Sequence, residues 1–508
     1  MKDPKPTRLG LLYTILLLST IALAYIWIPS TGHRQMNVML TISTVVVAIL
    51  LIFIWAMAFA RLPGGIRLRI AGAFMLFLIL AFSTLRIRGV TGDLVPILAW
   101  RWSEQSFGTV LFSSEVSGVQ TQDFPQFLGP YRNGTIGDKE LISWESNPPK
   151  EVWRIKVGEG WAAFAVSGQI AVTQEQRGEE ECVVAYDLAT GEQLWVHADE
   201  ARYASALGGV GPRATPTIDE DRVYTIGSTG LFNCLDVETG SLHWSKNILD
   251  ENSGRQPEWG LAGSPLILDK LVIVSPGGSA DRSLVAYSKD TGAFVWGGGT
   301  VRAGYSSPSL HTVAGREQIL IFNGGSVAGH DPADGKVLWE VDWPLTYGCV
   351  AQPLPISENR VFVSTGYGIG CKLFEISTEN GQFRADLLYE TPRLKAKFAN
   401  FVHYEGYIYG LDDGVFVCLD PETGQRKWKR GRYGHGQILR VGGKLIVQTE
   451  DGEIVLVELN PEKLIELAKL PALNSKTWNN PILAGSLMIV RNDREAVCYE
   501  VGLEDDAI

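Results

Sequence analysis

The stretch AYDLATGEQLW, residues 185–195, decides the fold because altered copies of it recur along the chain. Each full copy has a glycine followed four residues later by a tryptophan, and these glycines are Gly191, Gly240, Gly292, Gly335 and Gly424. A degraded copy keeps Gly381 without the tryptophan, so the six glycines are 49, 52, 43, 46 and 43 residues apart. A repeat of this length indicates one supersecondary unit per copy, stacked against its neighbours.

The repeated phrase has a physical interpretation. An apolar strand ends at Asp187, whose side chain can cap the turn that follows, and Gly191 supplies the positive φ that such a turn requires. The next strand then carries Trp195. A tryptophan repeated once per unit buries a large flat surface between adjacent sheets. The spacing leaves room for four short strands per unit, which is the blade of a β-propeller.

Eight units can be counted after residue 150. They span about 161–195, 210–244, 260–296, 303–339, 348–387, 397–428, 435–469 and 478–502. The last unit is short, whereas residues 151–157 form an isolated strand before the first unit. We therefore predict an all-β, eight-bladed propeller over residues 122–508, in which 151–157 completes the eighth blade and removes the open sheet edges. A seven-bladed ring is the alternative, because the fifth and seventh units lack the full phrase.

These residues carry a family resemblance. The phrase at 185–195 resembles the tryptophan-docking repeat of pyrroloquinoline quinone (PQQ) propellers, and FPQFLGPYRNG at 124–134 is similar to the lead-in of many bacterial members. That superfamily contains the quinoprotein alcohol and glucose dehydrogenases and the non-catalytic outer-membrane assembly factor BamB. The resemblance covers about residues 122–502. It is specific for the fold and implies either a dehydrogenase or a binding scaffold.

Three apolar segments precede the repeats, at about 9–29, 38–60 and 67–87. Each is long enough to cross a hydrocarbon core of ~30 Å, so we expect a membrane domain at 1–88 with membrane lipid as a partner. The short loops carry six basic residues on the side of the N-terminus and four on the other side. This bias predicts a cytoplasmic N-terminus and a periplasmic propeller on a bacterial inner membrane, with the reverse orientation as the alternative.

Residues 89–121 are expected to be a juxtamembrane linker. Trp100 and Trp102 lie in it, either as anchors in the lipid headgroup zone or as side chains that pack on the propeller. Residues 1–101 carry a net charge of +8 and the remainder carries −19. An acidic propeller argues against nucleic acid as a partner, because phosphate binding needs a basic surface.

The resemblance implies that residues leading into the innermost strands face a central funnel. The candidates for binding a cofactor there are Arg213, Trp259, Tyr305, Lys397, Asn400 and Trp478, and further funnel positions are Arg302, Lys395, His435 and Asn479. PQQ with Ca²⁺ would need a stacking aromatic, cations for its carboxylates and several oxygen ligands for the metal. The first two requirements are met by the set. Carboxylates are scarce in these positions, so neither a metal ligand nor a catalytic base can be named.

The cysteines favour a non-catalytic interpretation. The chain has no adjacent cysteine pair, which quinoprotein alcohol dehydrogenases use as a disulfide ring over the cofactor. Cys234, Cys418 and Cys498 instead share one repeat position, filled by alanine or glycine in other units. We interpret it as a slot for small side chains in a crowded inner strand. The sequence also lacks GxxxxGK[ST], HExxH, CxxC and GxSxG motifs.

The function that follows is a membrane-anchored extracytoplasmic scaffold, similar to BamB, with a protein or peptide partner on the propeller face. The alternative is a PQQ-dependent, membrane-bound quinoprotein dehydrogenase that oxidises an alcohol or a sugar.

Overall fold

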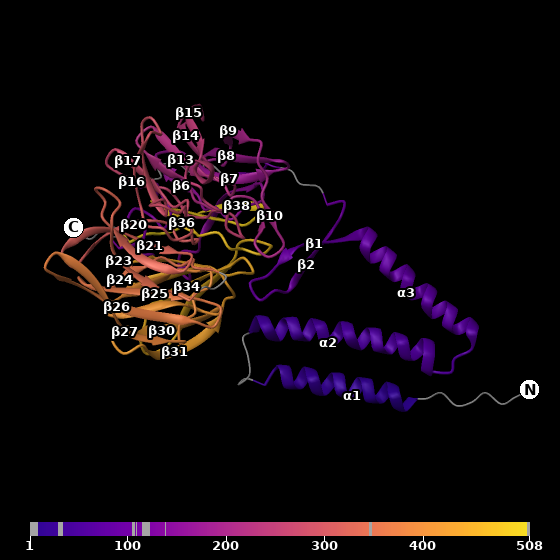
Figure 1. Ribbon diagram of the computed structural model, residues 1–508. Helices are drawn as coiled ribbons and strands as arrows, with labels where there is room; N and C mark the ends of the chain where they lie inside the picture. The colour runs from indigo at the N-terminus through magenta and orange to yellow at the C-terminus, as the bar shows by residue number, and fades with distance from the viewer. Residues whose placement is uncertain are drawn as a thin grey trace, which may run out of the picture. The chain divides into compact units, whose positions relative to one another are not determined.

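The computed structural model describes residues 9–28, 34–103, 107, 109–113, 122–137, 139–344 and 348–504. The chain forms two compact units. The first consists of Met1–Glu104 with Ala206–Gly209, and the second of Gln105–Ser205 with Val210–Ile508. The first unit holds the long helices, and the second holds the blades (Figure 1).

Three helices make up most of the first unit. They are α1 (Leu9–Ile26), α2 (Arg34–Ile54), which continues as the π-helical turn η1 (Trp55–Phe59), and α3 (Gly64–Thr84). All three are long and apolar enough to cross a membrane, and almost none of their side chains is buried within the protein. The expected spans at 9–29, 38–60 and 67–87 therefore fall on helices. The third helix ends at Thr84, earlier than expected, because the chain turns into strand β1 at Leu85.

The second unit contains eight antiparallel sheets of the propeller, each running from an innermost to an outermost strand. Blade one consists of β6 (Ala165–Ser167), β7 (Ile170–Arg177), β8 (Glu180–Asp187) and β9 (Gln193–Asp199), and blade two of β12 (Thr217–Asp219), β13 (Arg222–Ile226), β14 (Leu231–Asp236) and β15 (Leu242–Asn247). Blade three consists of β16 (Leu266–Leu268), β17 (Leu271–Val274), β18 (Leu284–Ser288) and β19 (Phe294–Gly298). Blade four consists of β20 (Ser309–Val313), β21 (Arg316–Asn323), β22 (Ser326–His330) and β23 (Val337–Asp342).

Blades five to eight complete the ring. Blade five consists of β24 (Leu354–Pro355), β25 (Arg360–Thr365), β26 (Gly370–Glu379) and β27 (Gln382–Thr391), and blade six of β28 (Phe401–Tyr404), β29 (Tyr407–Asp412), β30 (Val415–Asp420) and β31 (Gln425–Arg432). Blade seven consists of β32 (Gln437–Val441), β33 (Lys444–Gln448), β34 (Glu453–Glu458) and β35 (Ile465–Pro471). Blade eight consists of β36 (Ile482–Ala484), β37 (Leu487–Arg491), β38 (Glu495–Glu500) and β5 (Lys150–Lys156). The eight-bladed prediction is confirmed. Short elements between blades are β10 (Ala204–Ser205), β11 (Gly209–Val210) and α4 (Ile248–Glu251).

The ring closes with the strand that the sequence predicts. β5 pairs antiparallel with β38, with Lys156 opposite Glu495 and Lys150 opposite Glu500. The eighth blade thus joins one strand from before the first blade to three strands from the end of the chain. Such closure ties the two ends of the repeat region together in one sheet, and the outer edges that remain on the blades are short.

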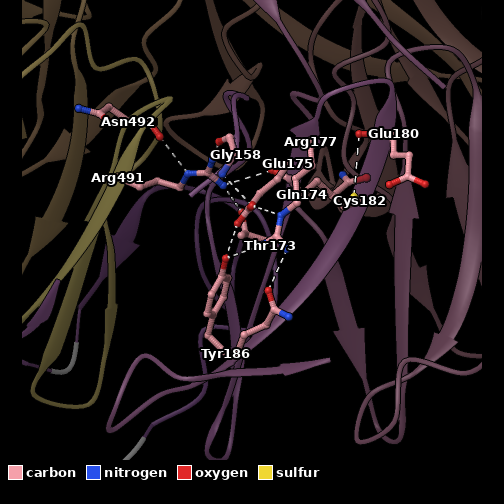
Figure 2. A network of polar contacts seen from close by, with 11 residues as sticks. Gly158, Thr173, Gln174, Glu175, Arg177, Glu180, Cys182, Tyr186, Arg491 and Asn492 are labelled. Atoms are coloured by element: carbon pink, nitrogen blue, oxygen red, sulfur yellow. Dashed lines mark hydrogen bonds and ion pairs between the residues drawn. The ribbon is translucent and has the colours of Figure 1, made fainter. Parts of the chain in front are cut away.

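A buried arginine holds the eighth blade to the first (Figure 2). Arg491 on β37 is fully buried, and its Nη1 donates to Thr173 Oγ1 at 2.6 Å and to the Gln174 carbonyl at 3.2 Å, both on β7. Its Nη2 donates to the Gly158 carbonyl at 3.1 Å. The Gly158 N–H in turn donates to the buried Glu175 carboxylate at 2.7 Å. A buried guanidinium is tolerated here because its donors are satisfied across the seam.

The small-residue slot is explained by the register of the blades. In six of the eight blades it lies on the third strand, not on an inner strand as expected, and it pairs directly with the tryptophan of the fourth strand. The pairs are Ala185 with Trp195, Cys234 with Trp244, Ala286 with Trp296, Gly329 with Trp339, Cys418 with Trp428 and Cys498 with Trp153. A large indole opposite this position leaves room only for a small neighbour, so the cysteines there are packing residues.

Each of these tryptophans also contacts the following blade. Trp195 Nε1 donates to the Val237 carbonyl at 2.9 Å, and a methyl group on Gly240 would lie 2.5 Å from the Trp195 ring. Equivalent hydrogen bonds from one blade to the next are made by Trp153, Trp244, Tyr389 and Trp428. The pattern is broken twice among the described residues. Trp296 Nε1 has no hydrogen-bond partner there, and Trp339, which precedes the blade with the degraded copy, donates to Gln318 of its own blade. These hydrogen bonds also reach a blade without the full phrase, since Trp428 donates to Asn460 of blade seven.

Two further strands come from the segment before β5. β3 (Val110–Ser113) pairs with β5 as a fifth, outermost strand of blade eight, although the sequence predicts only a linker at these residues. β4 (Thr135–Ile136) pairs in parallel with the innermost strand β32 of blade seven. The lead-in at 124–134 connects the two, and Phe124 forms a bridge to Val166 on β6. These pairings fasten the N-terminal part of the propeller to blades one, seven and eight.

Candidate functional site

The candidate site lies where the innermost strands begin. The blades repeat one strand order, so the starts of their inner strands gather on one face of the ring and their ends on the other. The lead-in at 124–134 occupies the second face, where the Gly134 carbonyl accepts from Arg440 N–H at 2.9 Å and the Pro125 carbonyl from Ile218 N–H at 2.8 Å. The funnel candidates precede the inner strands and therefore belong to the first face.

Two predicted funnel residues are stacked on each other. The rings of Trp259 and Tyr305 lie 5.1 Å apart at 27°, and the Trp259 N–H donates to the Tyr305 hydroxyl at 3.2 Å. The ring of Tyr367, from the loop between β25 and β26, lies 6.1 Å from that of Trp259. Lys397 Nζ lies 5.3 Å from the centre of the Tyr367 ring, which is a cation–π distance. Blades three, four, five and six thus meet at one cluster.

A second aromatic group continues from this cluster. Phe398 follows Lys397 in the chain, and its ring lies 4.9 Å from that of Trp478. Trp478 lies 4.9 Å from Trp161, and Lys476 Nζ lies 3.8 Å from the centre of the Trp478 ring. We call the aromatic and cationic side chains at this mouth the funnel arc; its members are Trp161, Tyr203, Arg213, Trp259, Tyr305, Tyr367, Lys397, Phe398, Lys476 and Trp478.

Blade seven supports the arc with a carboxylate. Glu450 is buried, and it accepts from Trp478 Nε1 at 2.8 Å and from the His435 N–H at 3.1 Å. The ring of His435 lies 5.5 Å from that of Phe398. This carboxylate is therefore used to position Trp478 and the loop before β32.

Arg213 and Asn400 differ in their surroundings. The guanidinium of Arg213 lies 4.8 Å above the Tyr203 ring and donates to the Gly211 carbonyl at 2.6 Å. Asn400 is buried, and its side-chain oxygen accepts from the Gln352 N–H at 2.7 Å. Arg213 joins the funnel arc at blade two, whereas Asn400 links blades five and six and does not reach the aromatic groups through any described contact.

Three ionisable groups of the arc, Arg213, Tyr305 and Tyr367, keep their ordinary charge states at neutral pH. Burial lowers the pKa of Arg213 to about 10, opposed by Tyr203, Tyr305 and Glu181, so the guanidinium stays charged. Burial also raises the pKa of Tyr305 to about 12 and raises that of Tyr367, so both phenols stay neutral. The face therefore combines neutral aromatic surface with fixed positive charge. Among these groups, none is tuned toward neutral pH as a general acid or base would be.

The described residues lack a metal-binding cluster. Within the ranges that the structure describes, no group of three or more His, Cys, Asp or Glu side chains is arranged to hold a metal ion. All six cysteines are described, and each is buried as a free thiol. The arrangement can present stacking surface, cations and hydrogen-bond donors to a bound molecule.

Sequence reasoning missed several members of the arc. Trp161 and Phe398 precede inner strands like the predicted candidates, so their position in the repeat is a signal that could have found them. Tyr367 and Glu450 come from loops between the second and third strands of their blades. That loop has no fixed residue in the repeat, so only the folded chain brings these side chains to the mouth.

A comparison of the sequence with known families agrees with the fold. A family model described as outer membrane protein assembly factor BamB, of the PQQ-like repeat class, matches residues 133–259 and 179–430. The chain belongs to this PQQ-like propeller family. Its matched region includes the phrases at Gly191, Gly240, Gly292, Gly335 and Gly424, which dock one blade on the next.

A dehydrogenase is among the individual relatives of the chain. Quinohemoprotein alcohol dehydrogenase ADH IIB of Pseudomonas putida is 28% identical over 134 residues, which are 25% of this chain and 19% of that protein. The chain thus matches less than a fifth of the length of this relative.

Solved structures that are similar to this chain include BamB from Moraxella catarrhalis, with 16% identity, 77% of this chain and 99% of that chain covered, and a TM-score of 0.37. Quinohemoprotein alcohol dehydrogenase from Comamonas testosteroni has 12% identity, 75% and 80% coverage, and a TM-score of 0.44. The computationally designed Ika8 protein has 16% identity, 71% and 99% coverage, and a TM-score of 0.48.

Proposed function

We propose that this protein is a membrane-anchored scaffold that binds a protein or peptide partner at the funnel arc. The observation that carries the proposal is the arc itself, to which seven of the eight blades contribute side chains that contact their neighbours at the mouth, while Glu450 and His435 of blade seven contact Trp478 and Phe398. Tryptophan, tyrosine and arginine are the residues that most often dominate binding energy at protein interfaces. Their concentration on one face of an otherwise acidic domain favours partner recognition there.

The hydrogen-bonding state of Trp259 supports this proposal. Its indole Nε1 is buried and has no hydrogen-bond partner among the described residues. A buried donor without a partner costs free energy, of the order of 1–3 kcal/mol. An acceptor on a partner, such as a backbone carbonyl or a carboxylate, would recover that free energy once binding had opened this atom to contact.

PQQ fits the arc poorly. The aromatic and cationic requirements are met, but Trp259 stacks on Tyr305 rather than presenting that face to a planar ligand. The described residues also hold no cluster of carboxylates for Ca²⁺, whose usual sites have six to eight oxygen ligands. The quinoprotein dehydrogenase therefore stays the second candidate, supported by the family and by the ADH IIB likeness.

The proposed location follows from the helices and the loop charges. Three candidate spans would anchor the chain in a bacterial inner membrane, and the excess of basic residues near the N-terminus favours a cytoplasmic N-terminus and a periplasmic propeller. A periplasmic scaffold agrees with a family described by an outer-membrane assembly factor.

Site-specific photo-crosslinking in membranes tests the proposal. A photoreactive phenylalanine analogue replaces Tyr305 or Phe398 in the arc, and the control position is Tyr131, which is 73% exposed on the lead-in at the other face. We expect a discrete crosslinked adduct from the two arc positions. The same pattern of adducts from Tyr131, or no adduct from either arc position, would contradict a partner at the funnel mouth.

A further inference from the structure

A β-hairpin follows α3 without a break (Figure 1). Its strands β1 (Leu85–Val90) and β2 (Pro96–Trp100) pair antiparallel, with Leu85 opposite Trp100 and Ile87 opposite Leu98. Residues directly opposite in an antiparallel pair, and their neighbours two positions away, share one face of the sheet. Leu85, Ile87, Leu98 and Trp100 therefore form one apolar face, which we call the hairpin face. Its side chains at 87, 98 and 100 are 68%, 59% and 54% exposed.

The base of the hairpin is tied to the end of α3. The Arg101 N–H donates to the Thr84 carbonyl at 2.9 Å, and Arg101 Nε donates to the Phe82 carbonyl at 2.9 Å and the Leu85 carbonyl at 3.2 Å. These carbonyls belong to the last turn of the helix and the residue after it, where backbone acceptors lack helical partners. The arginine thus fixes the direction in which the hairpin leaves the helix.

The turn of the hairpin is tied to the start of α2. Asp93 Oδ2 accepts from Arg34 Nε at 2.5 Å, and the Gly92 carbonyl accepts from Gln35 Nε2 at 2.9 Å. α2 and α3 are consecutive helices joined by a short loop, and Phe53 stacks on Phe74 with ring centres 4.5 Å apart. If both cross the membrane, the start of α2 and the end of α3 lie at the same surface. The hairpin joins these two points, so its strands run along that surface rather than away from it.

We propose that the hairpin lies in the membrane interface and that the hairpin face contacts the boundary between lipid headgroups and acyl chains. The proposal rests on the membrane anchorage proposed above. The face continues directly from a lipid-exposed helix and ends in Trp100, which stacks on Trp102 at 5.3 Å and 14°. Tryptophan pairs of this kind are typical of the headgroup level. The opposite face carries Arg86, placed to reach phosphate groups or water.

This arrangement gives α2 and α3 a lipid-facing support at the surface where the chain leaves the membrane. A hairpin tied at both ends and immersed on one face resists tilting of α3 relative to α2. Its partner is therefore the lipid surface, and not a segment of a second protein.

Spin labels on opposite faces of the hairpin test the proposal in vesicles of the full-length protein. Leu98→Cys carries the label on the hairpin face, and its neighbour Ala99→Cys carries it on the opposite face. Ile87→Cys and Arg86→Cys form a second matched pair. The six native cysteines are buried, so the unmodified protein sets the background of labelling. Met75→Cys, on an exposed side chain within α3, reports whether that helix is in the bilayer.

We expect power saturation to show that labels at 98 and 87 collide several-fold more with dissolved oxygen than with a water-soluble nickel complex. Labels at 99 and 86 should show the reverse ratio. Equal nickel access at both positions of each pair, with the label at 75 still protected, would overturn the hairpin proposal alone. Labels at 98 and 87 that neither reagent reaches would indicate a protein cover and also overturn it. Nickel access at 75 would overturn the membrane anchorage and, with it, the hairpin proposal.

Discussion

Replacement of Gly240 by alanine should weaken the docking of blade one on blade two. Gly240 has φ +70°, and a methyl group there would lie 2.5 Å from the Trp195 ring. The left-handed backbone costs an alanine about 1 kcal/mol. Displacing a packed indole costs roughly 1–3 kcal/mol more. The expected loss in the free energy of unfolding is therefore about 2–4 kcal/mol.

Gly381→Ala is the matched control. Gly381 occupies the same position in the degraded phrase, with φ +77°, but no atom lies within 4 Å of the place that a methyl group would take. It should carry the backbone strain of about 1 kcal/mol and no packing cost. A third variant combines Gly240→Ala with Trp195→Ala, which removes the ring that the methyl group would strike. The added cost of Gly240→Ala in that background should fall to the value of the control.

Urea denaturation of the solubilised full chain, followed by tryptophan fluorescence, measures these differences. The midpoint should fall in the order wild type, Gly381→Ala and Gly240→Ala. Equal midpoints for the two glycine variants, or an unchanged cost of Gly240→Ala in the Trp195→Ala background, would refute the docking mechanism.

Three further outcomes are expected. Arg491→Met leaves the carbonyls of Gly158 and Gln174 without their donor, so it should lower the free energy of unfolding by roughly 2–3 kcal/mol. The readout is faster protease cleavage between blades eight and one. Unchanged cleavage would contradict the role of Arg491 in holding these two blades together. Burial raises the pKa of Glu181 to about 7 from an unfolded value of 4.5, so its contribution to stability is present below pH 4.5 and lost as the pH rises through 7. Glu181→Gln should therefore gain up to roughly 3 kcal/mol over wild type at pH 8.5 and little at pH 4, and parallel stability curves would contradict this. The six thiols are buried, and desolvation raises their pKa values. A thiol reagent at pH 8 should therefore react with none of them in the native protein and with all six in urea. Rapid labelling of the native protein would count against a packing role for the cysteines.

The repeat predicted the fold well because each full copy contains the two residues that determine the local structure, a turn glycine and a tryptophan that packs between sheets. The glycine must turn and the tryptophan must find a neighbour, so the spacing of the six copies gives the length of one blade, and the units without the phrase were counted from that length. The strand at 151–157 could be assigned because it precedes the first unit and the last unit is one strand short. The structure pairs it with β38 of that last blade. The sequence analysis placed Cys234 on an inner strand, which is wrong. Cys234 lies on the third strand opposite Trp244, and this pairing depends on the register between β14 and β15, which the sequence alone does not give.

Other features could not be predicted from the repeat. β3 is four residues long and lies outside any copy of the phrase, so nothing in its sequence indicates that it pairs with β5. In the candidate site, Trp259, Tyr305 and Trp478 were found from their place before inner strands. Tyr367 comes from a loop without a repeated residue, and the contact that places it 6.1 Å from Trp259 exists only after the ring has closed.

The most direct test of the central claim is a binding titration of the purified full-length protein with PQQ in the presence of Ca²⁺. A scaffold whose funnel arc serves a protein or peptide partner predicts no saturable binding of PQQ and no dye reduction with alcohols or aldoses. Stoichiometric binding of PQQ that is lost in Arg213→Ala or Trp259→Ala would contradict the account and identify the funnel arc as a cofactor site.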